Sequence, residues 1–282
     1  FKKEKTLVFA FQANIYAIII SKILNTKVIT RSNTSPSGWS SNFIKIFFYK
    51  FFLNLADDIM VNSKIFKREF FKRFNIKVKY IYNPFDKNFI KNKILNSKKD
   101  NFFKKQTLNL ISVSRLTDQK DHLTLLESLR YVDLKLKPRL MIIGTGKNLS
   151  KLQKYTNIHN LKKIVKFTGY LKNPYGNILN SKIVILTSKF EGLPNILIEA
   201  QYLKKYIIST DCPTGPKEIL LNGLAGDLIK IGDSKKLASL INSYYSNRKN
   251  NFEKINNGKE YFNRFDYKIN CKKYLNFVIN NF

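Results

Sequence analysis

The chain has 282 residues, of which 44% are hydrophobic and 25% are charged. That length and composition provide enough apolar surface for one large or two medium domains and exclude a disordered chain. The only cysteines are Cys212 and Cys271, and the only histidines are His122 and His159. Four such scattered residues, without a Cys-x-x-Cys pair, argue against a zinc cage and favour a reduced, cytosolic setting.

The net charge of +32 raises the question of a nucleic-acid partner, because clustered Lys and Arg neutralise phosphates. However, 43 of the 51 basic residues are Lys, and they are spread through sequence rich in Asn, Ile and Phe. This distribution indicates a compositional bias of the whole chain rather than a recognition stripe. Nucleic-acid binding is therefore a minor alternative, while anionic membranes and phosphorylated substrates fit the charge.

An apolar stretch over residues 7–20 is broken by Gln12 and Asn14, and it is shorter than the roughly 20 residues that cross a bilayer. We interpret it as a strand at 7–10 and a helix at 13–24. Because the chain does not begin with Met and starts inside this strand–helix unit, we expect a fragment that lacks its true N-terminus. The pattern continues with strands at 27–30, 58–61 and 79–81 and helices at 42–56 and 63–74.

The helix predicted at 42–56 has apolar side chains around most of its circumference. We expect one of its faces to pack inward, the face that carries Ile44, Phe47, Phe48, Phe51 and Leu55. Further apolar residues extend beyond that face and are flanked by Lys45 and Lys50; they are Phe43, Ile46 and Phe52. Basic residues next to exposed aromatic ones suit an anionic membrane surface. The alternative is a helix whose wide apolar face belongs entirely to the core.

A polar segment rich in Lys and Asn at 92–106 interrupts the pattern and is the best candidate for a domain boundary. The second part repeats strand, loop and helix about six times, as in a doubly wound parallel sheet, whose ligands lie beyond the carboxyl ends of the strands. Its predicted strands are 108–113, 139–143, 165–168, 183–187 and 206–209, and its predicted helices are 122–129, 149–155, 174–180, 195–203 and 217–222. The chain is thus predicted to be α/β, with a domain at 1–103, a second domain at 104–262, and a C-terminal helix at 263–282 that packs back on the first domain.

The loop after the strand at 108–113 contains Arg115 and Lys120. Two cations at the end of a parallel strand, ahead of a helix N-terminus, suit a doubly charged anion such as a diphosphate. In a chain so rich in Lys, solvated surface charges are an equally good interpretation. After the next strand, Gly144 and Gly146 allow the backbone to approach a ligand closely, but a dinucleotide fingerprint would require a third glycine where Leu149 stands.

The stretch SKFEGLPNILIEA, residues 188–200, follows another predicted strand. Gly192 favours an unusual turn there, and Pro194 suits the first position of a helix. The helix that follows is apolar on nearly all sides, so it is predicted to be buried, and a buried Glu199 needs hydrogen-bond partners. Two interpretations stay open: Glu191 and Glu199 are a helix-terminal acid and a member of an internal ion pair, or Glu199 holds ribose hydroxyls while Glu191 faces a reacting sugar.

The motifs SRLTDQK, IIGTG, FTGYLKN, SKFEGLPNILIEA and STDCPTGPKEIL occur in the order and spacing of the retaining family 4 glycosyltransferases, which the chain resembles. The resemblance covers the second domain, while VITRSNTSP, ADDIMVNSKIFKREF and YIYNPFD resemble the latter half of that family's first domain. The Gly-rich loop of the family's first domain, and the His that many members place there, have no counterpart in this sequence. Arg31, Ser32 and Asn33 occupy a comparable loop after a strand. The resemblance implies a GT-B fold of two facing Rossmann-like domains: a partial, acceptor-side domain at 1–103 and a nucleotide-sugar donor domain at 104–262.

The resemblance also implies roles for individual residues. Arg115 and Lys120 would stabilise the leaving nucleoside diphosphate without a metal, and Glu191 would orient the donor sugar, so these three are the expected catalytic residues. The leaving phosphate would itself take the proton of the acceptor, and Glu199 would hold the ribose. The expected donor-binding residues are Arg115, Lys120, Gly144, Gly146, Gly169, Tyr170, Phe190, Glu191, Gly192, Leu193, Pro194, Asn195 and Glu199.

The resemblance predicts a retaining transfer of a hexose or N-acetylhexosamine from a nucleotide sugar, expected to be UDP-linked, to a saccharide or polyprenyl-diphosphate-linked acceptor in cell-surface glycan synthesis. No cofactor and no metal are expected. The expected location is cytoplasmic and peripheral on the inner face of the plasma membrane, with an anionic membrane surface as a further partner and no nucleic acid. Two alternatives stay open: a sugar-nucleotide-binding fragment without catalysis, and a basic nucleic-acid-binding protein.

Overall fold

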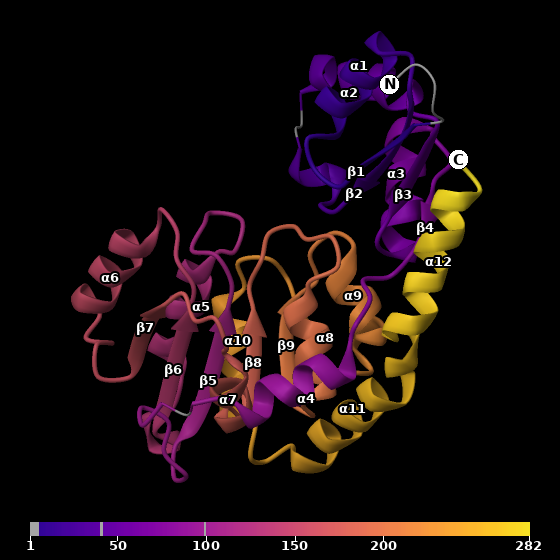
Figure 1. The fold of residues 1–282 in the computed structure, drawn as a ribbon. Helices are drawn as coiled ribbons and strands as arrows, with labels where there is room; N and C mark the ends of the chain where they lie inside the picture. Colours follow the sequence, from indigo (N-terminus) through magenta and orange to yellow (C-terminus); the bar gives the residue numbers. More distant parts are fainter. Residues whose placement is uncertain (1–5, 40–41, 99) are drawn as a thin grey trace.

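The computed structural model describes residues 6–39, 42–98 and 100–282, which form two α/β domains, each built on a parallel sheet (Figure 1). The first domain contains strands β1 to β4, and the second contains β5 to β10. Figure 1 shows the last helix, α12, running along the side of the molecule from the second domain to the first. The α/β class with parallel sheets, which the alternation of strand and helix patterns predicts, is confirmed.

The first sheet has the strand order β1-β2-β3-β4, and each neighbouring pair is parallel. Its strands are β1 (Leu7–Ala10), β2 (Lys27–Ser32), β3 (Asp58–Val61) and β4 (Lys79–Tyr80), and they are joined by α1 (Asn14–Ile23), α2 (Phe43–Asn54) and α3 (Lys64–Phe74). Ser63 caps the N-terminus of helix α3, which begins at Lys64: the Ser63 hydroxyl accepts a hydrogen bond from the N–H of Phe66. The Phe residues four apart on α3 are fully buried against the sheet, as expected for an amphipathic helix; they are Phe66, Phe70 and Phe74.

The second sheet has the order β10-β9-β8-β5-β6-β7, again with parallel neighbours. Its strands are β5 (Leu108–Val113), β6 (Pro138–Ile143), β7 (Val165–Gly169), β8 (Ile183–Leu186), β9 (Tyr206–Thr210) and β10 (Asp227–Ile229). Its helices are α5 (His122–Ser128), α6 (Leu149–Ile158), α7 (Tyr175–Asn180), α8 (Asn195–Tyr202), α9 (Gly215–Ile219), α10 (Ser234–Asn242) and α11 (Arg248–Glu260). Strands β6 and β7 are added on one side of β5, and strands β8, β9 and β10 are then added on the other side. The point between β5 and β8 is therefore the topological switch point, where doubly wound sheets bind ligands.

The chain passes between the domains twice. After β4, helix α4 (Lys87–Leu95) lies with the second domain, because Ile90 belongs to the same buried cluster as Tyr175 and Ile178 of α7. Helix α12 (Tyr267–Ile279) returns to the first domain, where Phe277 packs against Ile29 and other buried residues of the first sheet. The domain limits at 103 and 262 stay predictions, and this packing shows that segments before residue 103 contribute to the second core.

The orientation predicted for helix α2 is wrong. The face expected to pack inward is exposed, with exposed fractions between 38% and 75% for Ile44, Phe47, Phe48, Phe51 and Leu55. The opposite face faces the core, where Leu53 is fully buried and Ile46 and Tyr49 are partly buried. Because α2 is apolar on most sides, its sequence could not select a buried face. The buried face is the one that packs with residues of α1, α3 and Trp39 in the core of the first domain.

Candidate functional site

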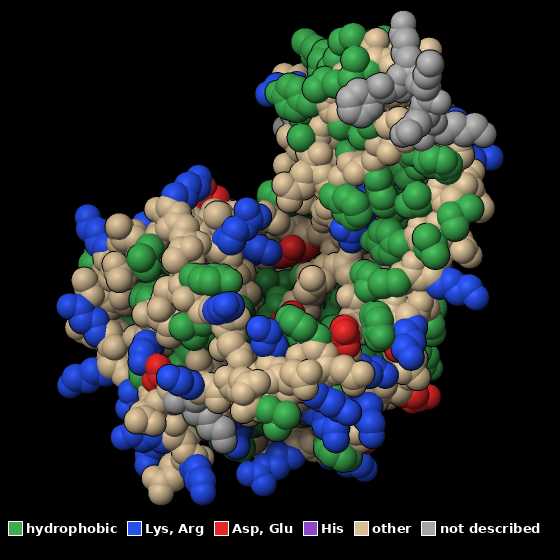
Figure 2. Space-filling view, in the orientation of Figure 1, with side chains coloured by type: hydrophobic (Ala, Val, Ile, Leu, Met, Phe, Trp, Pro, Cys, Tyr) green, Lys and Arg blue, Asp and Glu red, His purple; other side chains and the backbone are tan. Residues whose placement is uncertain are grey.

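The loops after β5 and β8 share one edge of the second sheet, because these strands are parallel neighbours with Leu110 opposite Ile183. Lys120 lies in the first loop and Glu191 in the second. Figure 2 shows a hollow between the two domains, with acidic side chains in and beside it. Lys and Arg are scattered over the visible face of the second domain rather than gathered in a stripe. The carboxyl ends of β5 and β8 lie side by side, so the predicted donor loops that follow them are brought together.

Lys120 and Glu191 form a buried ion pair. The Lys120 ammonium contacts Glu191 Oε1, and the two side chains are only 13% and 8% exposed. The Ser188 hydroxyl donates to the same carboxylate oxygen at 2.6 Å. Thr187 Oγ1 donates to the backbone carbonyl of Lys120 at 3.0 Å, which fixes the two loops against each other. A lysine ammonium has three N–H donors, so Lys120 can hold Glu191 and still donate to a ligand.

The backbone of Glu191 is held from both domains. The N–H of Ser35 in the first domain donates to the Glu191 carbonyl at 3.0 Å, and Thr214 Oγ1 donates to it at 2.7 Å. Cys212 lies close by, and its burial and the charge of Glu191 raise the pKa of its thiol to about 12. That thiol is protonated near neutral pH and is not a nucleophile. The site therefore presents a positioned carboxylate and an ammonium, with no reactive thiol beside them.

Gly192 is required for a reason other than the predicted turn. Its φ is not among the positive values found in the chain, so an unusual turn is not what selects glycine there. A Cβ at Gly192 would lie 1.9 Å from the carbonyl oxygen of Asn33, and Gly192 pairs with Thr34 in an antiparallel bridge. The residue keeps the β2 loop and the β8 loop in contact across the two domains. The expectation that Pro194 occupies the first position of the helix is wrong: its backbone is extended, with ψ 110°, and α8 starts at Asn195.

Other expected donor-binding residues of this loop are tied to neighbours through their backbones. The Phe190 carbonyl accepts from Gln119 Nε2 at 2.9 Å, and the buried Leu193 carbonyl accepts from Asn83 Nδ2 at 3.1 Å. Asn83 also donates to Asn195 Oδ1 at 2.6 Å. The start of α8 is thereby connected to the segment that links β4 with α4.

Arg115 is exposed, and its guanidinium has no hydrogen-bond or ion-pair partner among the residues that the structure describes. Its loop is fixed by the neighbouring Leu116 N–H, which donates to the Thr145 carbonyl at 2.8 Å. Gly144 and Gly146 pack against this loop: a Cβ on either would lie 2.0 or 2.3 Å from the carbonyl oxygen of Ser114 or Leu116. The close approach that these glycines permit is to another loop of the protein. A role for them in donor binding stays a prediction.

Glu199 lies apart from the ion pair. It accepts a hydrogen bond from Tyr175, and its burial raises the pKa of its carboxyl despite that bond. Within the described residues, no hydrogen bond or ion pair joins Glu199 to Glu191 or Lys120. The two glutamates therefore occupy different environments, and the predicted partner requirement of Glu199 is met by a neutral phenol.

Gly169 is the last residue of β7, and Tyr170 follows it at the same edge of the sheet. Gly169 has φ +73°, with open space where a Cβ would be, and its carbonyl accepts the N–H of Gly144 at 2.9 Å. Tyr170 is exposed. Their roles toward a donor stay predictions.

The sequence interpretation did not single out several residues that the structure places at this edge. Ser188, the second residue after β8, holds Glu191, and its position close to a strand end was a usable signal. Ser114 Oγ and His122 Nε2 are 3.1 Å apart, and burial, with the charge of Lys120, lowers the pKa of His122 to about 4. A neutral His122 therefore positions the β5 loop rather than carrying charge. Among the described residues, no cluster of three or more His, Cys, Asp or Glu side chains is arranged to hold a metal ion.

The family model described as glycosyl transferases group 1 matches residues 93–261. The chain belongs to this family. A glycosyltransferase of Methanocaldococcus jannaschii described as uncharacterised is 35% identical over 239 residues, which are 78% of this chain and 58% of that protein. A Campylobacter jejuni protein named N-acetylgalactosamine-N,N'-diacetylbacillosaminyl-diphospho-undecaprenol 4-alpha-N-acetylgalactosaminyltransferase is 28% identical over 245 residues, 83% of this chain and 65% of that protein. The chain thus spans less than two thirds of the length of either relative.

Solved structures show the fold of this group 1 glycosyltransferase chain. HepE of Anabaena, crystallised with UDP and glucose, matches 97% of this chain and 78% of its own with a TM-score of 0.82 and 19% identity. The apo lipopolysaccharide outer core galactosyltransferase WaaB matches 98% of this chain and 75% of its own with a TM-score of 0.69 and 22% identity. These likenesses confirm the GT-B fold. Over the described residues, none of the helices has the length and apolar character needed to span a bilayer.

Proposed function

We propose that the protein transfers a hexose or N-acetylhexosamine, with retention, from a UDP-linked sugar to a saccharide or polyprenyl-diphosphate-linked acceptor in cell-surface glycan synthesis. The observation that carries the proposal is the buried Lys120–Glu191 pair, which Ser188 supports at the switch point of the second sheet. This is the edge where a doubly wound sheet binds nucleotides. The pair joins a cation for phosphate oxygens with a carboxylate for sugar hydroxyls.

The proposed chemistry places positive charge at the leaving group. Breaking the sugar–phosphate bond develops negative charge on the nucleoside diphosphate, and preorganised cations stabilise that charge in the transition state. Arg115 has its guanidinium free for this purpose among the described residues, and Lys120 retains two unused N–H donors. We propose that these two residues act in place of a metal ion.

The carboxylates have separate proposed roles. Glu191 orients the hydroxyls of the donor sugar and stabilises the positive character that develops at its ring, while Glu199 accepts hydrogen bonds from the ribose. The leaving phosphate takes the proton of the acceptor hydroxyl, so no side chain acts as a conventional base. The separate environments of the two glutamates support this division of roles.

The proposed donor and acceptor classes take support from related proteins. HepE was crystallised with UDP-glucose as well as with UDP and glucose. Two Campylobacter jejuni relatives are named for transfer of N-acetylgalactosamine to undecaprenol-linked saccharides. A lipid-linked acceptor places the enzyme at a membrane. We propose that it works in the cytoplasm on the inner face of the plasma membrane.

The α2 outer face supports that location; it consists of the exposed residues Phe43, Ile44, Phe47, Phe48 and Phe51. These positions form one helical stripe, and α2 contains Lys45 and Lys50 but no acidic residue. An apolar stripe beside lysines suits the headgroup region of anionic lipids. We propose that this face contacts the membrane.

Isothermal titration calorimetry with UDP tests the proposal. We expect UDP to bind equally well with and without EDTA, and Arg115→Ala to weaken binding roughly tenfold, since a hydrogen bond to a charged group is worth about 1.5 to 3 kcal/mol. Arg248→Ala, at the exposed start of α11, is the control and should bind like the parent. Retention is tested by NMR of the anomeric linkage in the product. Metal-dependent UDP binding, or inversion of the anomeric centre, would contradict the proposal.

A further inference from the structure

A cavity of about 640 Å³, the amino-edge cavity, lies where β5, β8 and β9 begin in the second sheet. This volume is within the range of small-molecule sites. Its walls come from the segment before β5, from the connections that lead into β8 and β9, and from the region of α10 and α11. Figure 1 shows this edge on the side of the second domain that faces away from the first domain. None of the roles proposed for the donor loops uses this cavity.

Five lysines line the amino-edge cavity, and no Asp or Glu does; they are Lys104, Lys105, Lys182, Lys204 and Lys205. The abundance of Lys in the chain does not account for this lining, because Lys makes up 43 of 282 residues but five of the thirteen that line the cavity.

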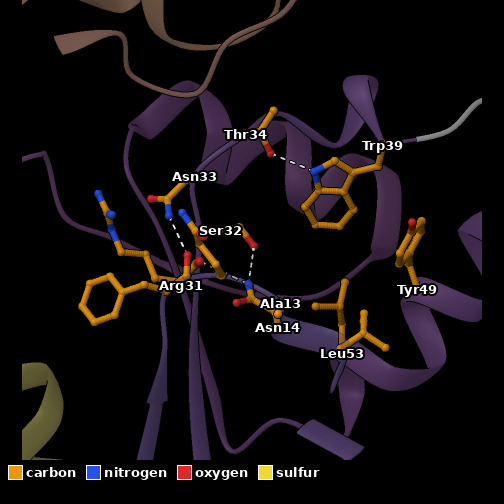
Figure 3. A pocket seen from close by; sticks show the side chains of 12 residues that line it. Ala13, Asn14, Arg31, Ser32, Asn33, Thr34, Trp39, Tyr49 and Leu53 are labelled. Atoms are coloured by element: carbon orange, nitrogen blue, oxygen red, sulfur yellow. Dashed lines mark hydrogen bonds between the residues drawn. The ribbon is translucent and has the colours of Figure 1, made fainter. Parts of the chain in front are cut away.

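A second cavity offers a comparison within the same chain. It lies in the first domain and is shown in Figure 3. No lysine lines it, and its one charged side chain, Arg31, donates to Asn83 Oδ1. Hollows of this Lys-rich protein are therefore not cationic as a rule, and the charge of the amino-edge cavity is a property of that place.

Hydrogen bonds hold the walls of the amino-edge cavity against one another. Asn109 of β5 is buried, and its Nδ2 donates to the carbonyl of Lys104 at 3.1 Å and to that of Asn180 at 3.0 Å. The N–H of Lys182 donates to the Asn109 carbonyl at 2.8 Å. The backbones that carry Lys104 and Lys182 are thus fixed to the same buried residue.

Lys205 carries a charge that the protein balances only in part. Its ammonium donates to the carbonyls of Leu179 and Ser181, at the C-terminal end of α7, at 2.6 and 3.0 Å. Carbonyls at a helix end supply only partial negative charge. Burial and the charge of Lys182 lower the pKa of Lys205 to about 8. Because an ammonium has three N–H donors, Lys205 keeps one for a ligand.

The protein itself supplies no counter-ion for these charges. Among the ion pairs that the described residues form, none includes any of the five lysines. Asp227 contacts the hydroxyl of the lining residue Tyr206, but it is already paired with Lys254 at 2.7 Å. Like charges held together without a counter-ion repel one another, and a bound anion would remove that repulsion.

Phosphate is the anion that suits this lining. Lysine binds phosphate as a compact point charge. One phosphate monoester carries about two negative charges near neutral pH, so five ammonium groups match two phosphates better than one. We infer that the amino-edge cavity binds a small group that carries two phosphates, held by the five lysines that line it.

This site is separate from the proposed donor site. The six residues of β5 lie between the two edges of the sheet, which at about 3.3 Å per residue places the edges about 20 Å apart. A group bound in the amino-edge cavity therefore does not touch Lys120 or Glu191. The inference goes beyond the proposed function, because the transfer itself has no use for phosphates at this edge.

Calorimetric titration with inorganic diphosphate in metal-free buffer tests the inference. The probe is titrated into the full chain and into Arg115→Ala, which weakens binding at the donor loops. We expect saturable binding that Arg115→Ala retains. In that background, Lys104→Gln with Lys105→Gln should weaken the binding about tenfold or more, because charge-assisted hydrogen bonds are lost. Lys182→Gln changes a different wall and should weaken it by a similar factor.

Lys272→Gln with Lys273→Gln is the matched control. It also removes two adjacent exposed lysines, but these lie on α12 and do not line the cavity. Because the net charge falls by the same amount, this control separates local contacts from the general attraction of a basic protein for anions. We expect its affinity for diphosphate to stay close to that of Arg115→Ala.

Vesicle flotation identifies the source of the phosphates. The cavity variant and the control variant are compared on vesicles of phosphatidylcholine that contain a phosphatidylinositol bisphosphate. Weaker flotation of the cavity variant would assign the two phosphates to a lipid headgroup. Equal flotation of the two, with calorimetry that still differs, would assign them to a soluble molecule. Either result supports the site.

Three results would overturn the inference. They are an Arg115→Ala chain that binds no diphosphate, binding that both cavity variants leave unchanged, and an equal loss in the cavity and control variants. Calorimetry with UDP is a separate measurement. A chain that binds diphosphate as expected here but never binds UDP would contradict the proposed function and leave the amino-edge site standing.

Discussion

The carboxyl edge of the second sheet and the α2 outer face follow opposite rules. At the sheet edge, several polar side chains in the loops after β5 and β8 have defined partners: Lys120 holds Glu191, Ser188 supports the same carboxylate, and Thr187 fixes the Lys120 backbone. On α2, large apolar side chains such as Phe47 are exposed, with nothing in the described structure covering them. The first region buries charge, and the second exposes apolar surface.

In both regions, an arrangement that lowers the stability of the folded chain indicates a functional role. Burying an ion pair costs desolvation free energy, and exposing a stripe of phenylalanines forgoes burial of apolar area. Neither arrangement is what a chain selected for stability alone would adopt. The sheet edge is therefore expected to lose stability and function together when one partner is removed, while the α2 outer face should lose only an interaction with an external partner.

The largest expected effect is on stability at the sheet edge. Lys120→Ala leaves Glu191 buried with only Ser188 as a partner, and breaking a buried pair costs about 3 kcal/mol. Urea unfolding should show a clear fall in the midpoint concentration. The double variant Lys120→Ala/Glu191→Gln should recover most of the loss, because no unpaired charge then remains. A double variant as unstable as Lys120→Ala would mean that packing of the lysine side chain, not its charge, matters.

The second prediction sharpens the separation of the two glutamates. Glu191→Gln should lower kcat by about tenfold to a hundredfold with little change in UDP affinity, since its interaction strengthens as charge develops. Glu199→Gln should instead raise KM for the donor more than it lowers kcat, because ribose binding is similar in ground and transition states. Steady-state kinetics with the full-length enzyme measures both. Unaltered donor kinetics in both variants would return the pair to a structural role.

The third prediction concerns the α2 outer face. Phe47→Ser with Phe51→Ser should reduce flotation with vesicles that contain anionic lipid by about tenfold or more, because each half-exposed phenylalanine has apolar area to bury in the interface. Phe71→Ser is the matched control, since Phe71 is exposed to a similar extent on α3. Thermal stability should stay close to that of the parent in all variants. If Phe47→Ser with Phe51→Ser floats with vesicles as well as the parent does, the proposal that the α2 outer face contacts the membrane is wrong.

The smallest expected effect is a pH-dependent gain in stability. Burial raises the pKa of Glu199, so the folded state holds this proton more tightly than the unfolded state, whose value is about 4.3. The stability that this provides is present below that ordinary pKa and is lost as the pH rises through the raised one. Glu199→Gln should therefore have a slightly higher urea midpoint than the parent above neutral pH and the same midpoint near pH 4. A variant that is less stable above neutral pH would indicate that the carboxylate braces α8.

Much of the fold followed from local pattern. The strands β3 and β5 have the predicted limits; α1 is one residue shorter than predicted at each end, and α3, α7 and α8 are one residue shorter at one end. The alternation of apolar runs and turn residues is a local property, so sequence reveals it. Helix α4 was not predicted, because its sequence KNFIKNKIL is mostly polar and only Ile90 is fully buried. Strand β10 and helices α10 and α11 were likewise outside the predicted set.

The sequence by itself determined that cations and carboxylates follow the strands of a doubly wound sheet, because strand ends and motif spacing are fixed along the chain. Tertiary structure decided which of them meet: Lys120 with Glu191 across adjacent strands, and Glu199 with Tyr175 instead. It also decided that Gly192 is needed for the approach of Asn33 and that α2 turns Leu53, not Phe51, inward. These outcomes depend on surfaces that residues far apart in the sequence present to one another, and no local pattern contains that information.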